Sequence, residues 1–161
     1  MAETAFHIAP ARSAADLIAV ADLFQAYANS LGIDLGYQDF PAELAGLPGR
    51  YAPPAGALLL ARDAAGTPVG CVALRRIDPP GCCEMKRLYV APSGRGLGLG
   101  RALAEAVIAA AEQLGYREIR LDTLPFMQAA MRLYDELGFD QIPPYYDTPV
   151  DGTRFLAKRL R

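Results

Sequence analysis

The residues best suited to chemistry lie between Arg87 and Arg101, in the run RLYVAPSGRGLGLGR. An apolar, strand-like stretch leads into a loop with glycines at 94, 96, 98 and 100, and a helical pattern follows directly. Glycine lets a backbone approach a ligand closely, and the unpaired amides of a first helical turn favour an anion. Arg95 and Arg101 can add charge-assisted hydrogen bonds. The run therefore predicts a phosphate-binding loop, although a plain turn with a helix cap fits the same residues.

The glycine spacing excludes two familiar phosphate-binding motifs. The dinucleotide fingerprint G-x-G-x-x-G would require a third glycine where Leu99 or Arg101 stands. The phosphate loop of NTPases ends in Gly-Lys-Ser/Thr, and no such tripeptide occurs here. The pattern that does fit is Arg-x-x-Gly-x-Gly, formed by Arg95, Gly98 and Gly100.

This pattern resembles the pyrophosphate-binding motif of the GNAT superfamily of N-acetyltransferases. Residues 130–139 resemble the next motif of that family, a helix written A-x-x-L-Y-x-x-x-G-F. Two motifs in the family's order are far more specific than either alone, and the resemblance is good over residues 70–139. The stretches EMKRLYV, RLDTLPFM and IPPYY together are similar to a bacterial subgroup whose acceptors are poorly defined.

The resemblance implies acetyl-CoA as co-substrate. The loop would hold the pyrophosphate, and the strand before it would pair with the pantetheine arm and donate a backbone N–H to the thioester oxygen. Many family members carry an asparagine near the start of the last helix, where this chain has Met127. The implied cofactor-binding residues are Leu88, Tyr89, Val90, Arg95, Gly96, Leu97, Gly98, Gly100, Arg101, Met127 and Tyr134.

Tyr134 is the candidate general acid, because the pKa of a phenol, about 10, is close to that of a thiol, about 8.5. It can therefore protonate the leaving thiolate. A helical wheel places it beside Met127, at the margin of an apolar face. That face is formed by Phe126, Ala130, Leu133 and Leu137. The competing interpretation is a tyrosine that packs its ring and hydrates its hydroxyl; the surrounding motif favours the acid.

Glu84 is the candidate general base, because an amine with a pKa of about 10 must lose a proton before it attacks. Strand alternation places Glu84, Lys86, Leu88 and Val90 on one face, and Met85, Arg87 and Tyr89 on the other. A carboxylate on a central strand is costly unless solvated or paired. A structural ion pair with Lys86, Arg87 or Arg75 fits Glu84 equally well. Arg87 and Arg76 are also candidates for meeting an acidic substrate.

Composition predicts one globular domain over residues 1–161. With 52% hydrophobic residues the chain can fill a single core, and a net charge of −2 argues against a nucleic-acid surface. Three cysteines, two of them adjacent, form no disulfide framework and indicate a reducing, cytoplasmic compartment. One histidine and no C-x-x-C predict that no metal is bound. We find no secretion signal and no apolar run near the ~20 residues that span a bilayer.

The remaining pattern predicts a mixed α/β sandwich. Strands are expected at 6–9, 57–62, 69–76, 84–90, 118–123, 139–142 and 154–160. Helices are expected at 13–31, 40–45, 99–114 and 126–137. The third of these helices has an apolar face of Leu99, Leu103, Val107, Ala110 and Leu114, with Ile108 off that stripe. Strands one to four should be antiparallel and strands four and five parallel; the resemblance implies that these two splay around acetyl-CoA.

The resulting hypothesis is an acetyl-CoA-dependent N-acetyltransferase in which an amine attacks directly, without a covalent enzyme intermediate. The acceptor is a small amine, an amino acid, or a protein N-terminus or lysine. A non-catalytic acetyl-CoA or CoA sensor is the alternative, and an interaction domain is more distant. Tyr145 and Tyr146 either wall the acceptor site or form a rigid packed connection. A homodimer is expected only by analogy of fold.

Overall fold

The computed structural model describes residues 6–161, without the side chain of residue 37. Its strands are β1 (Phe6–Pro10), β2 (Ala57–Asp63), β3 (Pro68–Ile77), β4 (Cys82–Val90), β5 (Glu118–Thr123), β6 (Asp140–Ile142) and β7 (Arg154–Arg159). Its helices are α1 (Ala14–Leu31), α2 (Phe40–Ala45), α3 (Leu99–Gln113) and α4 (Gln128–Glu136). Short 3-10 turns lie at η1 (Leu35–Gln38), η2 (Gly49–Tyr51) and η3 (Pro92–Gly94).

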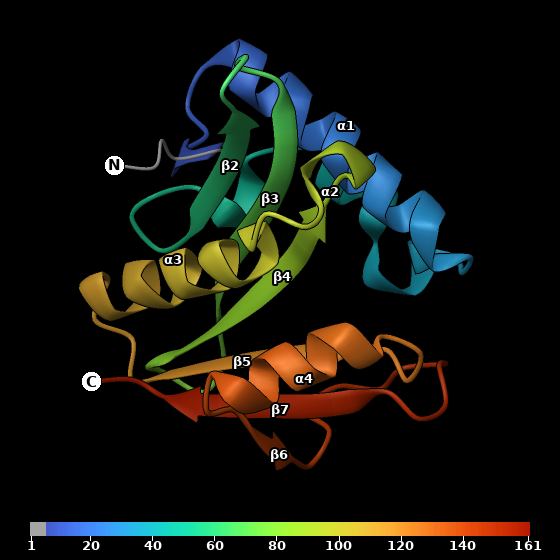
Figure 1. Cartoon of the computed structure of the whole chain (residues 1–161). Helices are drawn as coiled ribbons and strands as arrows, with labels where there is room; N and C mark the ends of the chain where they lie inside the picture. The colour runs from blue at the N-terminus through green and yellow to red at the C-terminus, as the bar shows by residue number, and fades with distance from the viewer. Residues whose placement is uncertain (1–5) are drawn as a thin grey trace.

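The described strands form one mixed sheet in the order β1-β2-β3-β4-β5-β7-β6 (Figure 1). Strands β1 to β4 pair antiparallel in sequence order, and β4 pairs with β5 in parallel through the crossover helix α3. Strand β7 then pairs antiparallel with both β5 and β6. The predicted mixed α/β fold is confirmed.

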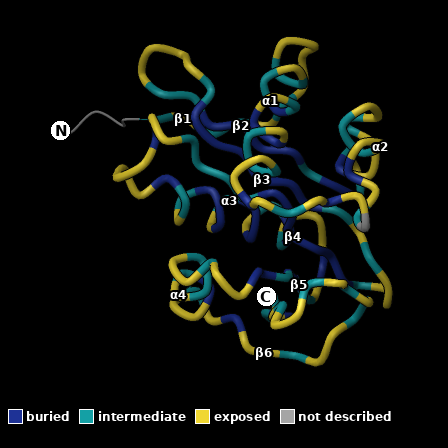
Figure 2. The backbone as a smooth tube through the Cα atoms, turned by 90° about the vertical axis from the view of Figure 1, so that its right-hand side faces the viewer, coloured by how far each residue is buried: buried dark blue, intermediate teal, exposed yellow. Residues whose placement is uncertain are grey.

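Helices cover both faces of this sheet and create two apolar cores (Figure 2). The first core lies under α3 and takes in Leu99, Leu103 and Val107 together with Tyr134 of α4. The second lies under α1 and contains Phe24 among its fully buried side chains. Strand β4 contributes residues to both cores, so its two faces must differ in what they contact.

Local sequence explains where α1 begins and ends. Ser13 Oγ accepts the amide of Asp16 at 3.0 Å, and the Asp16 carboxylate accepts the amide of Ser13 at 3.3 Å, which is a capping box. Gly32 ends the helix with φ 67°, a conformation that glycine adopts at little cost. Asp16 also accepts from Arg62 Nη2 at 2.9 Å, which fixes α1 to β2.

Two helical details differ from the sequence prediction. In α3, Ile108 is buried and Leu114 is 40% exposed, because a helix that crosses several strands buries a stripe wider than one row and Leu114 lies at its C-terminal end. Helix α4 begins at Gln128, since Met127 has the non-helical angles φ −90° and ψ 64°. Phe126 is consequently 55% exposed and does not belong to the buried face of α4.

Candidate active site between strands β4 and β5

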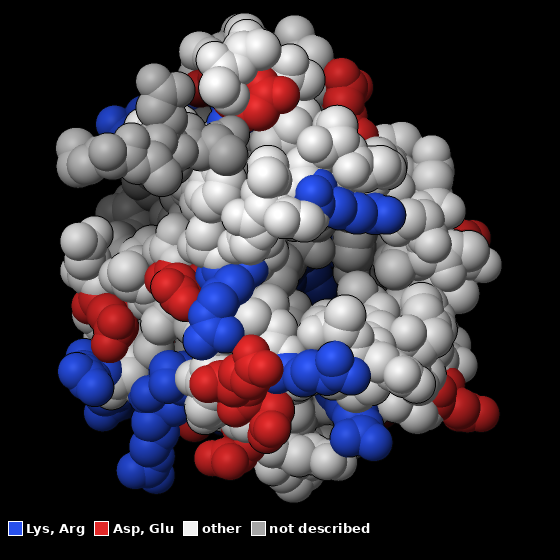
Figure 3. Space-filling model, in the orientation of Figure 1, with Lys and Arg blue, Asp and Glu red and all other residues white. Residues whose placement is uncertain are grey.

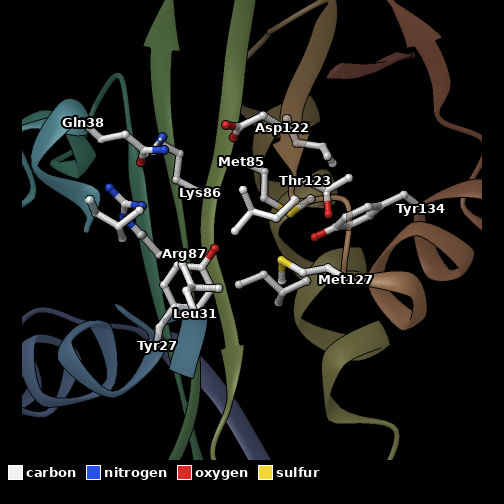
Figure 4. Close-up of a pocket in the computed structure, with 14 residues that line it drawn as sticks. Tyr27, Leu31, Gln38, Met85, Lys86, Arg87, Asp122, Thr123, Met127 and Tyr134 are labelled. Carbon is white, nitrogen blue, oxygen red and sulfur yellow. Dashed lines mark hydrogen bonds between the residues drawn. The ribbon is translucent and has the colours of Figure 1, made fainter. Parts of the chain in front are cut away.

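The parallel strands β4 and β5 are joined only at their beginnings. Residues 82–84 pair with residues 118–120, and beyond Glu84 the two strands diverge (Figure 1). β5 remains paired with β7 along its whole length. The edge of β4 from Met85 to Val90 therefore faces a gap rather than a neighbouring strand. A cavity lies in this gap, bounded by β4, β5, the C-terminal part of α1, η1 and α4 (Figure 4).

A β-bulge interrupts β4 beside this cavity. Between Lys86 and Tyr89, the two residues Arg87 and Leu88 lie opposite the single residue Val72 of β3. Arg87 takes φ 62°, in the left-handed region that non-glycine residues rarely occupy. The bulge adds a residue to β4 and interrupts its regular pairing with β3.

The bulge also overturns the predicted alternation of β4. Glu84, Lys86, Leu88 and Val90 were expected on one face, but Leu88 and Val90 pack with Met85 in the core under α3. Lys86 reaches the opposite side, where its Nζ lies 3.2 Å from Gln38 Oε1 of η1. The extra residue reverses the alternation of side chains after position 86. The residue types in the strand do not predict this bulge.

The structure brings three predicted cofactor-binding residues into the cavity, namely Leu88, Met127 and Tyr134. Tyr89 and Val90 continue along β4 beyond it, and the Tyr89 ring lies edge-on to Tyr27 with centroids 6.0 Å apart. The predicted loop residues lie further on, where β4 leads into α3.

Tyr134 is a buried residue of α4, 6% exposed, rather than a residue at the margin of the buried face. Its ring packs edge-on against Phe139, with centroids 5.7 Å apart. Its hydroxyl points into the cavity near Thr123 (Figure 4), and among the described residues none hydrogen-bonds it. Burial raises the pKa of Tyr134, so this phenol keeps its proton throughout the neutral range. Its pKa is therefore further from that of a thiol than the sequence argument assumed, and the phenol is a weaker acid than expected.

The glycine loop shapes the start of α3. Gly98 caps the helix with φ 73° and has no side chain to bond the first-turn amides. The amides of residues 99–101 are therefore available to an anion. Gly94 is buried, and a Cβ there would lie 2.9 Å from the Val69 Cβ, so the close packing of this turn requires glycine.

The two arginines that bracket this loop differ in how their charges are met. Arg95 is exposed, and its Nε donates to the Val90 carbonyl at 3.3 Å. Arg101 forms ion pairs with Glu105 and Glu136, both at 2.9 Å. Among residues 6–161, no carboxylate forms an ion pair with the Arg95 guanidinium.

The Glu84 carboxylate is buried and fully engaged. It is 1% exposed, pairs with Arg75 Nε at 2.8 Å, accepts from the Tyr145 hydroxyl at 2.6 Å and lies 4.0 Å from Lys86 Nζ. Burial raises its pKa, but the charges of Lys86 and Arg75 and the hydrogen bonds lower it more, so the net shift is downward. An ion pair with Arg75, one of the expected alternatives, is present; a base role stays a prediction.

We expect Glu84→Gln to destabilise the fold by about 3 kcal/mol at pH 7, because two buried or half-buried cations lose their counter-charge. A carboxyl whose folded pKa is depressed stabilises the fold above its unfolded pKa of about 4.3 and loses that effect as pH falls through the folded value. The difference in the free energy of unfolding between wild type and Glu84→Gln should therefore shrink below about pH 4. Urea unfolding of both proteins at pH 7 and in acid measures this difference. A difference that stays constant with pH contradicts the assignment.

The Arg87 guanidinium is held by α2. Its Nε and Nη2 donate to the Glu43 carboxylate at 2.9 and 3.0 Å, and its Cζ lies 5.0 Å from the Phe40 ring centroid. Arg87 was a candidate for pairing with Glu84 or meeting an acidic substrate, and its fork contacts Glu43 instead. Arg76, the other such candidate, is exposed and does not line the cavity.

Removing the charge of Glu43 should be strongly destabilising. Glu43→Gln leaves the 5% exposed Arg87 without a counter-ion, and we expect a loss of about 3–5 kcal/mol. The matched control is Glu105→Gln, which breaks an exposed pair and should cost less than about 1 kcal/mol. Urea unfolding of both variants decides the matter, and equal losses would mean that the α2 pair contributes no more than a surface pair.

Tyr145 and Tyr146 form the packed connection that was one of the two expected interpretations, and neither lines the cavity. Their rings pack on Phe155 of β7, with centroid separations of 5.1 and 5.2 Å. Their hydroxyls reach back to β4 and β5, since Tyr145 donates to Glu84 and Tyr146 to Asp122. The segment thus supports the carboxylates of Glu84 and Asp122, of which Asp122 lines the cavity.

Sequence reasoning missed several polar residues of the cavity. These are Gln38, Lys86, Asp122 and Thr123. Lys86 was considered only as a partner of Glu84, and Asp122 lies in the stretch RLDTLPFM without having been singled out. Thr123 Oγ1 is buried and has no hydrogen-bond partner among the described residues. The available signal was the position of Lys86 and Asp122 as polar residues next to apolar positions of their strands.

The three cysteines are buried and form no disulfide. Burial raises the pKa of the Cys83 thiol to about 12, and it also raises the pKa of the Cys71 thiol. Within residues 6–161 no group of three or more His, Cys, Asp or Glu side chains is arranged to hold a metal ion. Across the same residues, no helix combines the length and apolarity needed to cross a membrane.

The profile of the Acetyltransferase (GNAT) family matches residues 18–139, and the chain belongs to this family. An uncharacterised N-acetyltransferase of Schizosaccharomyces pombe is 44% identical over 86% of this chain and 85% of its own length. A GNAT-family acetyltransferase structure from Staphylococcus aureus has a TM-score of 0.82 at 23% identity, covering 98% of this chain and 100% of that one. The structure of yncA, a putative acetyltransferase from Salmonella typhimurium with its cofactor acetyl-CoA, has a TM-score of 0.67 at 22% identity, covering 98% and 95%.

Proposed function

We propose that this protein transfers the acetyl group of acetyl-CoA to a primary amine by direct attack, with Tyr134 as general acid. The observation that carries the proposal is the cavity itself. The Tyr134 hydroxyl points into a gap bounded on the other side by the open edge of β4. Membership of an N-acetyltransferase family and a fold neighbour described with acetyl-CoA support the same chemistry.

The residues around the cavity fit acetyl-CoA. The unpaired edge of β4 at residues 88–90 offers backbone N–H and C=O groups to an extended amide chain, as a neighbouring strand would. The buried Thr123 hydroxyl lacks a partner among the described residues. The amides of 99–101 and the Arg95 guanidinium suit a pyrophosphate. When bound, acetyl-CoA supplies an activated thioester.

The protein's own groups then perform three tasks. A backbone N–H of β4 after the bulge donates to the carbonyl oxygen, where negative charge develops. Tyr134 holds a proton for the departing sulfur, because its raised pKa keeps the phenol neutral. In the balanced reaction a C–N bond forms as the C–S bond breaks, and the ammonium loses two protons. One proton in effect becomes the thiol proton of CoA, by way of Tyr134, and the other goes to solvent.

Glu84 remains the candidate base that takes up the second proton of the amine before it is released to solvent. If it acts as base, Glu84→Gln lowers kcat/KM and removes the acid limb of its pH profile. If the carboxylate only pairs with Arg75, the variant loses stability while the pH profile of the folded fraction stays the same.

The test is amine-dependent release of CoA thiol from acetyl-CoA, with an N-acetylated product identified by mass spectrometry. We expect release only when an amine is present. Stabilisation by acetyl-CoA without release with any amine would instead indicate the alternative, a non-catalytic acetyl-CoA sensor.

A further inference from the structure

Lys86 is a buried cation whose charge is only partly met. Its side chain is 5% exposed, and its polar neighbours are Gln38 Oε1 at 3.2 Å and Glu84 Oε1 at 4.0 Å. This ion pair has the longest N–O distance among those of the described residues. Glu84 is already held by Arg75 at 2.8 Å and by Tyr145 at 2.6 Å. Lys86 therefore shares a counter-ion that has a closer cation.

A poorly compensated ammonium in the interior is costly unless an anion joins it. Burial lowers the pKa of Lys86, and the positive charges of Arg87 and Arg75 lower it further. The negative charges of Glu84 and Asp122 act in the opposite direction. Arg75 and Arg87 each have a close carboxylate of their own. A ligand carboxylate beside Lys86 would supply the charge that the protein provides only at 4.0 Å.

Lys86 lies across the cavity from Tyr134. Figure 4 shows Lys86 and Gln38 on one side of the cavity and Tyr134, Thr123 and Met127 on the other. Figure 3 shows basic atoms at the bottom of a hollow on the face of the molecule. The proposed cofactor contacts lie across the cavity at Tyr134, at the start of α3, and at residues 88–90, beyond Lys86 along β4. The end of the cavity with Lys86 is therefore left for the molecule that receives the acetyl group.

Asp122 provides a matching negative group. It lines the same cavity from β5, and among the described residues no Lys or Arg forms an ion pair with it. The Tyr146 hydroxyl donates to its carboxylate and fixes it in place. The negative charge of Asp122 acts to raise the pKa of both Lys86 and Tyr134, so it influences both ends of the cavity.

We propose that the acceptor is a free α-amino acid whose carboxylate binds Lys86 and Gln38 while its amino group lies against Asp122. This inference rests on the proposed function and narrows its acceptor. The amino nitrogen forms the C–N bond as the thioester C–S bond breaks, with the proton balance given above. In a protein N-terminus an amide replaces the carboxylate, and a neutral amide leaves the Lys86 charge unmet. Leu31 and Leu35 also bound the cavity with apolar side chains.

The first test compares wild-type turnover with the common L-amino acids, their C-terminal amides and dipeptides that begin with the same residues. We expect at least one free amino acid to exceed its amide in kcat/KM by about 10-fold or more, as one charge-assisted hydrogen bond supplies. Equal rates with acid and amide, or a preference for dipeptides, would overturn the proposal. This comparison does not depend on the folding of any variant.

The second test uses Lys86→Met, which keeps the chain length and removes the charge. For the preferred amino acid we expect kcat/KM to fall about 10–100-fold, mainly through KM, and the preference over the amide to disappear. Lys158→Met, on β7 and outside the residues that line the cavity, is the matched control and should change neither. A preference that survives in Lys86→Met would overturn the assignment of Lys86.

A binding measurement separates failure of this inference from failure of the proposed function. The thermal midpoint is recorded with N-acetyl-amino acids and with their amides, in wild type and Lys86→Met, and separately with acetyl-CoA. Stabilisation by the acids that depends on Lys86 supports a carboxylate site even if acetyl-CoA has no effect, in which case the transferase proposal fails alone. Stabilisation by acetyl-CoA with no difference between acids and amides overturns the carboxylate site alone.

Discussion

Tyr134→Phe should lower kcat by about 100-fold or more, because general acid catalysis typically contributes 10²–10⁴ and the phenylalanine ring cannot give a proton. The substitution removes one oxygen and keeps the ring contact with Phe139, so the fold and acetyl-CoA affinity should change little. Steady-state CoA release gives kcat, and calorimetric titration gives the affinity. A transition-state interaction is lost when kcat falls and binding does not.

The control for this variant is Tyr116→Phe. Tyr116 is also buried, but its hydroxyl donates to the Ala55 carbonyl outside the cavity, so its removal should leave kcat unchanged. Because the pKa of Tyr134 is raised, the wild-type rate should show no loss from its ionisation up to about pH 10. An unchanged kcat in Tyr134→Phe at neutral pH would show that another group or water protonates the sulfur.

Arg95→Gln should weaken acetyl-CoA binding by about 10-fold or more, because a charge-assisted hydrogen bond to a phosphate contributes about 1.5–3 kcal/mol. Arg101→Gln is the control within the same loop. Its guanidinium is already met by Glu105 and Glu136, so its loss should weaken binding much less. Titration calorimetry at two salt concentrations measures both variants, and only the wild type and Arg101→Gln should retain strong salt dependence.

Equal effects at the two positions would contradict this ranking, and would indicate that Arg101 leaves its carboxylates to reach the pyrophosphate. No effect at either position would remove the phosphate assignment of the loop. The glycines would then be explained by packing alone, as Gly94 is by the nearby Val69 side chain.

Local signals carried most of the fold. Helix ends depend on residues within a few positions, such as Ser13 before α1 and Gly98 before α3, so the helices were predicted close to their observed bounds. The strand from Glu118 to Thr123 was predicted with its observed bounds. The Arg-x-x-Gly-x-Gly pattern likewise marked the loop, because a backbone turn and a helix start are local features.

What the sequence could not give depends on contacts between distant segments. Arg87 was one of three candidate partners for Glu84 of its own strand, whereas its observed partner Glu43 comes from a short helix more than forty residues earlier in the chain. The bulge at Arg87 depends on how β4 meets β3, and it reversed the expected faces of Leu88 and Val90. Alternation is a local rule, and one extra residue is enough to invalidate it.

The candidate site shows the same division. Tyr134 was found through its motif, although its helix begins two residues later than predicted and buries it more deeply. Lys86 and Asp122 were missed because they become neighbours of one cavity only when β4 and β5 separate. The cytoplasmic location, a homodimeric state and the absence of nucleic-acid or membrane partners stay predictions.

The most direct test of the account is the thermal midpoint of the protein without ligand and with acetyl-CoA, CoA or ADP. A ligand at about 100 times its dissociation constant adds about 2.7 kcal/mol of stability, which for a domain of this size raises the midpoint by roughly 5–10 °C. We predict such a rise with acetyl-CoA, larger than with ADP, because the β4 edge and the cavity add contacts to those of the loop. No rise at millimolar acetyl-CoA would contradict the assignment of the gap between β4 and β5 as a cofactor site.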